Sequence, residues 1–193
     1  MSSVELCFDY ASPWSYLASE IASRQLPGAT IVHRPVYLRG FPQFTTGVPY
    51  DAARLSYLAA DLRRCTAHWG VPLQVPPEFP LNGLYALRGA LWVEEQAPER
   101  FAAYHQAMFR AAWRDATPVS KKDEVVRVAA GAGLDPAAFA AGIDAAEIKD
   151  RLRAQTDAVR GRGAFGVPTF FVGGEMFFGH DRMDYVRRAL GAG

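Results

Sequence analysis

Two serines three residues apart, Ser12 and Ser15, stand between a short apolar stretch and a longer one rich in alanine and leucine. Serine is a favoured helix N-cap and proline is favoured at the first helical position, so Ser12 and Pro13 predict the start of a helix. A helix N-terminus also binds anions, because its free N–H groups carry partial positive charge. Ser12 therefore has two interpretations: a helix cap, or a hydroxyl that donates a hydrogen bond to a bound thiolate or oxyanion.

The dipeptide Val167-Pro168 is a second candidate, directly before the apolar run Thr169–Val172. Proline at the first position of a strand breaks no ladder hydrogen bond, which explains the residue without any function. A cis peptide bond at this position would instead let Val167 offer its N–H and C=O to a peptide-like ligand.

A third candidate is the segment Gly179-His180-Asp181, just before the last apolar-periodic stretch. Aspartate is a good helix cap, so Asp181 predicts the start of a final helix. The alternative interpretation is a ligand site, in which the Asp181 carboxylate binds an ammonium group and the N–H groups of the first turn bind a carboxylate.

Elements at both ends of the chain can bring these segments together. Alternating residues predict a strand over Val4–Asp9, and a second strand follows the first helix over Thr30–Arg34. This β-α-β order implies parallel strands. Near the other end, Gly173-Gly174 divides the apolar segment 169–178 into a tight β-hairpin.

The middle of the chain, residues 50–162, has an almost entirely helical pattern. Asp51 and Gly70 predict the two ends of one helix, and Asp135-Pro136 and the pair Asp144 and Glu147 predict the starts of two others. The outer pieces, 1–45 and 163–193, can form one four-stranded sheet only if residues 46–162 are a helical insertion.

Composition excludes several other classes of protein. The 193 residues are 50% hydrophobic and 21% charged with a net charge of +1, values typical of a globular chain without a nucleic-acid-binding footprint. Neither a membrane-spanning run nor a secretory signal is recognisable. The two cysteines, Cys7 and Cys65, form no CxxC, and the four histidines have no metal-ligand spacing. We expect a cytoplasmic protein with reduced thiols and no metal.

A strand, then Ser-x-x-Ser on a helix, then Val-Pro-Thr before a β-β-α end resembles the thioredoxin layout with serines in place of cysteines. Three segments, Phe8–Ala18, Phe109–Asp115 and Phe165–Arg182, are similar to the kappa-class glutathione transferase and 2-hydroxychromene-2-carboxylate isomerase group, relatives of DsbA. The resemblance covers the whole chain and is strongest to the bacterial isomerases. It implies an α/β fold: a thioredoxin-like four-stranded sheet with a large all-helical insertion.

The resemblance also implies a glutathione site. Ser12 would point at the glutathione sulfur as a thiolate stabiliser, and the Val167 backbone would pair with the cysteinyl part. The γ-glutamyl end would be held by Phe178, Gly179, His180 and Asp181, with Asp181 taking its ammonium group. The family often has a small polar residue at the position of His180.

The function implied is a glutathione-dependent isomerase of an aromatic carboxylate, acting as a homodimer. Residues 41–50 are expected to form a loop over the site. Candidate substrate contacts, each of which is also a candidate core residue, are Trp14, Phe41, Phe44, Tyr50, Tyr85 and Trp113, with Arg54 or Arg39 as the cationic partner. The alternatives are a kappa-type transferase or peroxidase and a non-catalytic binding protein. A disulfide oxidoreductase is disfavoured because Ser12 and Ser15 cannot form a disulfide.

Overall fold

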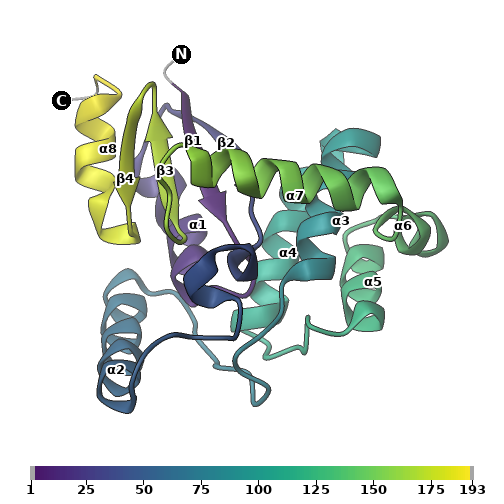
Figure 1. The fold of residues 1–193 in the computed structure, drawn as a ribbon, viewed down its shortest axis with the longest axis horizontal. Coiled ribbons are helices and arrows are strands. Elements are labelled where there is room, and N and C mark those ends of the chain that lie inside the picture. The colour runs from purple at the N-terminus through teal and green to yellow at the C-terminus, as the bar shows by residue number, and fades with distance from the viewer. Residues whose placement is uncertain (1–2, 192–193) are drawn as a thin grey trace.

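The computed structural model describes residues 3–191, and its elements follow the predicted order (Figure 1). The strands are β1 (Ser3–Phe8), β2 (Thr30–Pro35), β3 (Thr169–Val172) and β4 (Glu175–Phe178). The α-helices are α1 (Pro13–Gln25), α2 (Ala52–Trp69), α3 (Leu84–Gln96), α4 (Phe101–Trp113), α5 (Lys122–Gly131), α6 (Pro136–Gly142), α7 (Ala146–Gly161) and α8 (Met183–Ala189). Short 3-10 turns occupy Leu38–Gly40, Pro42–Phe44, Pro98–Arg100 and His180–Arg182.

The four strands form one mixed sheet in the order β2-β1-β3-β4. Strands β1 and β2 are parallel and joined by α1, whereas β3 is antiparallel to both β1 and β4. The two ends of the chain therefore meet in the centre of the sheet, where Leu6 lies opposite Phe170. This arrangement confirms the predicted α/β fold with a helical insertion between β2 and β3.

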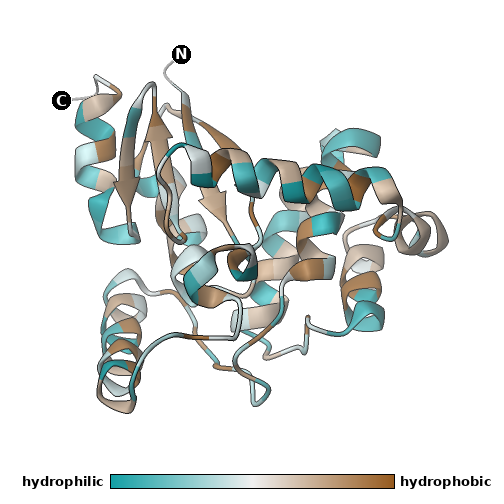
Figure 2. Ribbon diagram, in the orientation of Figure 1, coloured by the Kyte–Doolittle hydropathy of each residue, from teal (hydrophilic) through white to brown (hydrophobic). Residues whose placement is uncertain are grey.

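The alternation of side chains along β1 divides the core between the two faces of the sheet. Val4, Leu6 and Phe8 are fully buried on one face, in the main apolar cluster with residues of α1, α4 and α8. Cys7 lies on the other face, in a smaller cluster with Val159 near the end of α7. Figure 2 shows the strands mostly in brown, for hydrophobic residues, whereas the helices alternate between brown and teal.

The helical insertion shares the core of the sheet. The main cluster runs without interruption from β1 through α3, α4 and α5 to Phe139 of α6 and Leu152 of α7. Helix α2 differs, because only Leu62 and Thr66 of its 18 residues are buried, and it lies at one end of the molecule (Figure 1). The division of the chain at residues 45 and 163 stays a prediction. None of the helices in residues 3–191 is long and apolar enough to cross a membrane.

Most predicted helix ends are confirmed. Ser12, Asp51 and Asp135 are N-caps whose side chains accept a hydrogen bond from a first-turn N–H, and Gly70 ends α2 with a φ of 64°. The predicted cap at Asp144 is wrong, because α7 begins after Ala145 without a side-chain cap while Asp144 forms an ion pair with Lys122.

The predicted helix start at Asp181 is also wrong. Residues His180–Arg182 form a 3-10 turn, and α8 begins only at Met183 without a side-chain cap bond. The Asp181 carboxylate instead accepts a hydrogen bond from its neighbour Arg182, at 2.6 Å. The role of Asp181 is thus not explained by capping.

Candidate functional site

The first part of the candidate site is the N-terminus of α1. Ser12 has extended backbone angles, and its Oγ accepts a hydrogen bond from the Ser15 N–H at 3.2 Å. Within residues 3–191 the Ser12 hydroxyl donates no hydrogen bond, and the Trp14 N–H has no acceptor. Both donors are therefore available to an anion at the start of this 13-residue helix. Ser12 itself is 5% exposed.

The second serine of the motif lies deeper. Ser15 is fully buried, and its Oγ has no hydrogen-bond partner within the described chain. Its backbone N–H is already used by Ser12. Ser15 thus supports the turn from inside, and Ser12 is the serine nearer the surface.

The second part of the site is the segment before β3. The Val167-Pro168 peptide bond is cis, as predicted. Pairing of Cys7 with Thr169 places Val167 at the edge of the sheet where β1 ends, beside the turn that leads to Ser12. Among the described residues, the N–H and C=O of Val167 form no hydrogen bond, whereas the Pro168 carbonyl accepts one from the Gly179 N–H at 2.9 Å.

The third part is the turn after β4. The rings of His180 and Trp14 stack at 4.9 Å, which fixes this turn against the first turn of α1. Burial lowers the pKa of His180 below its ordinary value. Phe178 is 41% exposed and contacts the ring of Phe165 at 4.5 Å. The structure therefore brings the turn 178–181 beside α1, as the predicted site requires.

A buried carboxyl group that the sequence did not single out lies next to these parts. Asp9 is 1% exposed, and its two oxygens accept hydrogen bonds from the Ala11 N–H at 2.9 Å and the Leu38 N–H at 2.8 Å. Burial raises the pKa of Asp9 to about 6, against the opposing effect of these two hydrogen bonds. The available signal was an aspartate at the end of a buried strand, three residues before Ser12.

Asp9 also lines a small cavity of about 60 Å³. The cavity lies between the β1–α1 turn, the loop after β2 and the segment before α3. Its lining residues are Asp9, Ala11, Tyr37, Leu38, Arg39, Phe44, Gly47, Val48, Phe79, Pro80, Leu81, Asn82 and Gly83. The predicted loop 41–50 therefore borders this cavity through Phe44, Gly47 and Val48, and its place over Ser12 stays a prediction.

The candidate substrate contacts separate into exposed and core side chains. Phe41 and Trp113 are 1% and 0% exposed, and neither lines the cavity. Phe41 packs in the small cluster under α7, and the Trp113 indole N–H donates to the Tyr10 carbonyl at 2.8 Å. Their prediction as walls of the site is corrected by this burial.

The other candidates lie nearer the surface. The Arg54 guanidinium sits 4.2 Å from the centre of the Tyr50 ring, and Tyr50 contacts Phe44 at 6.4 Å. These three residues form a continuous row from α2 to the cavity. Tyr85 of α3 is half-buried beside Arg88 and does not line the cavity.

Neither cysteine provides a thiol for this site. Cys7 is buried in the sheet, where burial raises its pKa to about 12. Cys65 is on α2, and burial also raises its pKa. A nucleophilic sulfur at Ser12 would therefore have to come from a bound thiol.

Comparisons with known proteins find similar sequences and structures over nearly the whole chain. The family model of the DSBA-like thioredoxin domain matches residues 3–191. The chain is 32% identical to a 2-hydroxychromene-2-carboxylate isomerase of Pseudomonas putida, over 97% of this chain and 94% of the relative. It is 28% identical to human glutathione S-transferase kappa 1, over 97% and 90% of the two chains. A solved 2-hydroxychromene-2-carboxylate isomerase superposes with a TM-score of 0.84 at 30% identity, covering 98% and 94% of the chains.

Proposed function

The chain belongs to the DsbA-like thioredoxin family, with isomerases and kappa glutathione transferases among its relatives, and from this premise we propose that it is a glutathione-dependent isomerase. Its substrate is 2-hydroxychromene-2-carboxylate or a similar aromatic carboxylate. The observation that carries the proposal is the unused Ser12 hydroxyl at the N-terminus of α1, beside Val167 and the turn at His180.

Several polar groups without a partner in the described chain support glutathione binding here. The Ser12 O–H and the Trp14 N–H are free donors for the sulfur, and the Val167 main chain is free to pair with the cysteinyl part. The γ-glutamyl ammonium is assigned to Asp181, whose side chain is 58% exposed and therefore reachable. Binding there replaces a surface ion pair with Arg182, which costs little.

Ser12 would act by stabilising the ionised sulfur. A free thiol has a pKa of about 8.5, a helix N-terminus favours an anion by about 0.3–1 kcal/mol, and a hydrogen bond to a charged acceptor adds about 1.5–3 kcal/mol. Together these effects lower the pKa of a bound thiol to about 6 or 7, so that it is largely ionised at neutral pH.

Bound glutathione would supply a nucleophilic sulfur that adds reversibly to the substrate double bond and so permits rotation. The protein's own residues would do the rest. Ser12 would donate a hydrogen bond to the glutathione thiolate, and the loop that contains Phe44 would cover the reacting atoms. Arg39 lines the cavity beside Asp9 and is the better placed cation for the substrate carboxylate, since Arg54 is engaged with Tyr50 outside it.

The direct test is turnover of 2-hydroxychromene-2-carboxylate, followed by absorbance, with and without glutathione. We expect conversion that needs glutathione but leaves its concentration unchanged. S-methylglutathione is the matched control, because it keeps the binding groups but has no thiol, and it should support no turnover. Conversion at an equal rate without glutathione would contradict the proposal.

A kappa-type transferase or peroxidase is the second candidate, supported by the similarity to human glutathione S-transferase kappa 1. Such an enzyme would use the same glutathione sulfur but would consume glutathione in each turnover. Stoichiometric loss of thiol with an electrophilic aryl halide or a hydroperoxide, and none of the isomerisation, would favour this activity.

We also propose that the protein forms a homodimer, as the resemblance implies. Sedimentation velocity should then give about twice the 21.2 kDa mass of one chain. A single species of one chain's mass at micromolar concentration would exclude it.

A further inference from the structure

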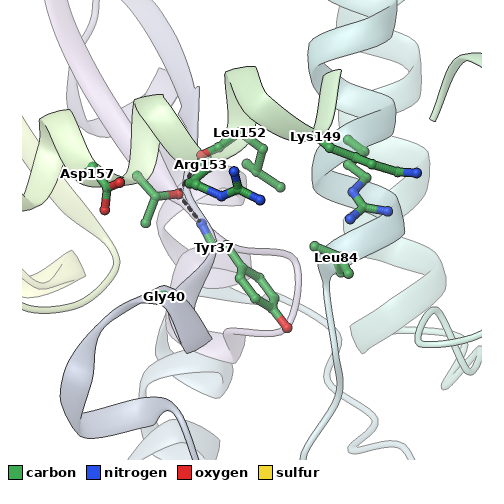
Figure 3. A pocket seen from close by; sticks show the side chains of 9 residues that line it. Tyr37, Gly40, Leu84, Lys149, Leu152, Arg153 and Asp157 are labelled. Carbon is green, nitrogen blue, oxygen red and sulfur yellow. Dashed lines mark hydrogen bonds between the residues drawn. The ribbon is translucent and has the colours of Figure 1, made fainter. Parts of the chain in front are cut away.

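A second, larger cavity lies away from Ser12, between α7, α3 and the turn after β2. Its volume is about 360 Å³, within the range of about 300–1,000 Å³ typical of small-molecule pockets. The lining residues are Tyr37, Gly40, Leu84, Arg88, Lys149, Leu152, Arg153, Thr156 and Asp157. Figure 3 shows Lys149 and Arg153 of α7 along one side, with Tyr37 and Leu84 on the other.

The charge around this cavity is strongly unequal. Three cationic side chains line it, Arg88, Lys149 and Arg153, against the single carboxylate of Asp157. Asp157 is already paired with Arg160 at 3.1 Å. Arg88 and Lys149 form no direct ion pair with any carboxylate of residues 3–191, although both attract the Asp144 carboxylate, which is itself paired with Lys122. The Arg153 pair with Asp150 is exposed and weak. An anion would therefore find an excess of positive charge.

Arg88 supplies the most specific observation. Its Nε is buried and has no hydrogen-bond partner in the described part of the chain. A buried donor without an acceptor is unfavourable, and a guanidinium binds carboxylates in a planar, two-point geometry. The guanidinium also lies 5.8 Å from the centre of the Tyr85 ring, one turn of α3 before it.

Apart from Thr156, the rest of the lining is mostly apolar. Leu152 is buried, and Leu84 and the ring of Tyr37 face the same space. The Tyr37 main chain is fixed to α7, since its N–H donates to the Thr156 hydroxyl at 3.0 Å. An apolar floor with cations at its rim matches an anion that has a flat hydrocarbon body.

We propose that this cavity binds an aromatic carboxylate at a site separate from Ser12. The carboxylate pairs with Arg88, assisted by Lys149 and Arg153, and the ring lies over Tyr37, Leu84 and Leu152. Tyr37 also lines the cavity beside Asp9, so the two sites share one wall. The inference does not rest on the proposed function, because no glutathione is needed for binding here.

The test is calorimetric titration of the full-length protein with 1-naphthoate in the absence of glutathione. We expect a Kd of roughly 1 mM or tighter from the size of the ligand. Arg88→Gln should weaken binding roughly tenfold or more. Arg153→Gln should weaken binding by a smaller factor. Because Arg153 is exposed, this substitution should leave the fold intact. 2-Naphthol has the same ring system without the carboxylate and should bind at least tenfold more weakly than 1-naphthoate.

Two control variants separate this site from its alternatives. Arg63→Gln removes an exposed guanidinium from α2 and should leave the Kd unchanged. Arg39→Gln removes the cation of the smaller cavity, so any change that it causes reports binding of 1-naphthoate there and not at Arg88. No binding at millimolar concentration, equal binding of 2-naphthol, or loss of binding in Arg39→Gln but not in Arg88→Gln or Arg153→Gln would each overturn the proposal.

Discussion

At the scale of single residues, the candidate site depends on one hydroxyl group. Ser12 uses its oxygen as an acceptor for the Ser15 N–H, and this leaves its hydrogen to be donated outward. A cap that only closed the helix would need the oxygen alone. The proposed role of Ser12 therefore concerns its donor, and a substitution can separate the two roles.

Ser12→Ala should raise the pKa of the bound glutathione thiol and lower the isomerisation rate most at and below neutral pH. The variant loses a hydrogen bond to a charged acceptor, of about 1.5–3 kcal/mol, which corresponds to about one to two pH units. The pKa rises because the ionised form loses a stabilising contact, so the fraction ionised falls at pH 7. The measurement is the thiolate absorbance at the far-ultraviolet edge, titrated against pH with glutathione bound.

Ser12→Thr is the matched control, because it keeps a hydroxyl and a good cap. Its titration midpoint should stay near that of the unmodified protein. If Ser12→Ala has the same midpoint as well, Ser12 is a helix cap and nothing more.

Asp181→Ala should weaken glutathione binding roughly tenfold, because it removes the carboxylate assigned to the ammonium group. The fold should be unaffected, since Asp181 caps no helix and bonds only to the exposed side chain of Arg182. Asp184→Ala is a suitable control, as Asp184 is an exposed aspartate paired with Arg187 on the next helix. Calorimetry that gave both variants equal affinity for glutathione would remove Asp181 from the site.

The roles of residues near the site could be predicted only where neighbouring residues in the sequence determine them. Ser12-Pro13 and Pro168 carry local signals, a cap followed by proline and a proline before a strand, and the structure confirms a helix start and a strand start at these positions. Phe41 and Trp113 show the limit, because an aromatic residue suits a core as well as a pocket wall. Asp9 was missed because its partner Leu38 lies 29 residues away.

At the scale of elements, three segments meet at the Asp9 carboxyl group. Its hydrogen bonds join the end of β1 to the loop after β2, and the start of α3 packs against it at Gly83. A Cβ atom at Gly83 would lie 2.0 Å from Asp9 Oδ1 and 3.2 Å from the Ala11 nitrogen. Gly83 is therefore required by close packing, since its own φ of −78° suits any residue.

Gly83→Ala should destabilise the protein by about 1–3 kcal/mol, because the added methyl group must displace the buried carboxyl group or the turn before Ser12. The free energy of unfolding is measured by urea denaturation. Gly131→Ala is the control: Gly131 lies in α5 with nothing within 4 Å of a Cβ atom. That substitution should leave stability unchanged or raise it by about 0.4–1 kcal/mol. Equal stability of the two variants would show that the close approach at Gly83 is relieved at no cost.

Helix ends show why some elements were predicted and others were not. Asp51 and Asp135 cap helices because the first-turn N–H is within reach of the side chain. Asp144 and Asp181 have the same residue type, but a cation competes for each carboxylate, Lys122 and Arg182 respectively. Lys122 is distant in sequence from Asp144, so no local pattern could have revealed that competition.

At the scale of the whole molecule, the sheet and the helical insertion are joined by a buried polar group. His105 of α4 lies 4.3 Å from the ring of His33 on β2. Its Nδ1 contacts the Tyr10 hydroxyl at 3.1 Å and its Nε2 contacts the Ser19 hydroxyl at 2.9 Å. Burial lowers the pKa of His33 to about 4 and that of His105 well below its ordinary value. Both rings are therefore neutral in the folded protein near neutral pH.

These two histidines should make the folded state lose stability in mild acid. In the unfolded chain a histidine has a pKa of about 6.5, so below this pH the unfolded state binds protons that the folded state does not. For His33 the loss begins near pH 6.5, grows by up to about 1.4 kcal/mol per pH unit, and ends near its folded pKa of about 4. Asp9 acts in the opposite direction, because its raised pKa lets the folded state bind the extra proton.

The histidine effect is isolated by comparing His33→Phe with the unmodified protein. The aromatic replacement keeps contacts with Phe8 and Phe101 but cannot bind a proton. The free energy of unfolding, measured in urea at pH 7 and pH 5, should fall by about 2 kcal/mol less in His33→Phe over this interval. His68→Phe, at an exposed position on α2, should show the same fall as the unmodified protein. If the free energy of unfolding falls by the same amount in His33→Phe and in the unmodified protein, His33 is protonated equally in the folded and unfolded states. The burial of His33 between the sheet and the insertion would then not determine the acid stability of the fold.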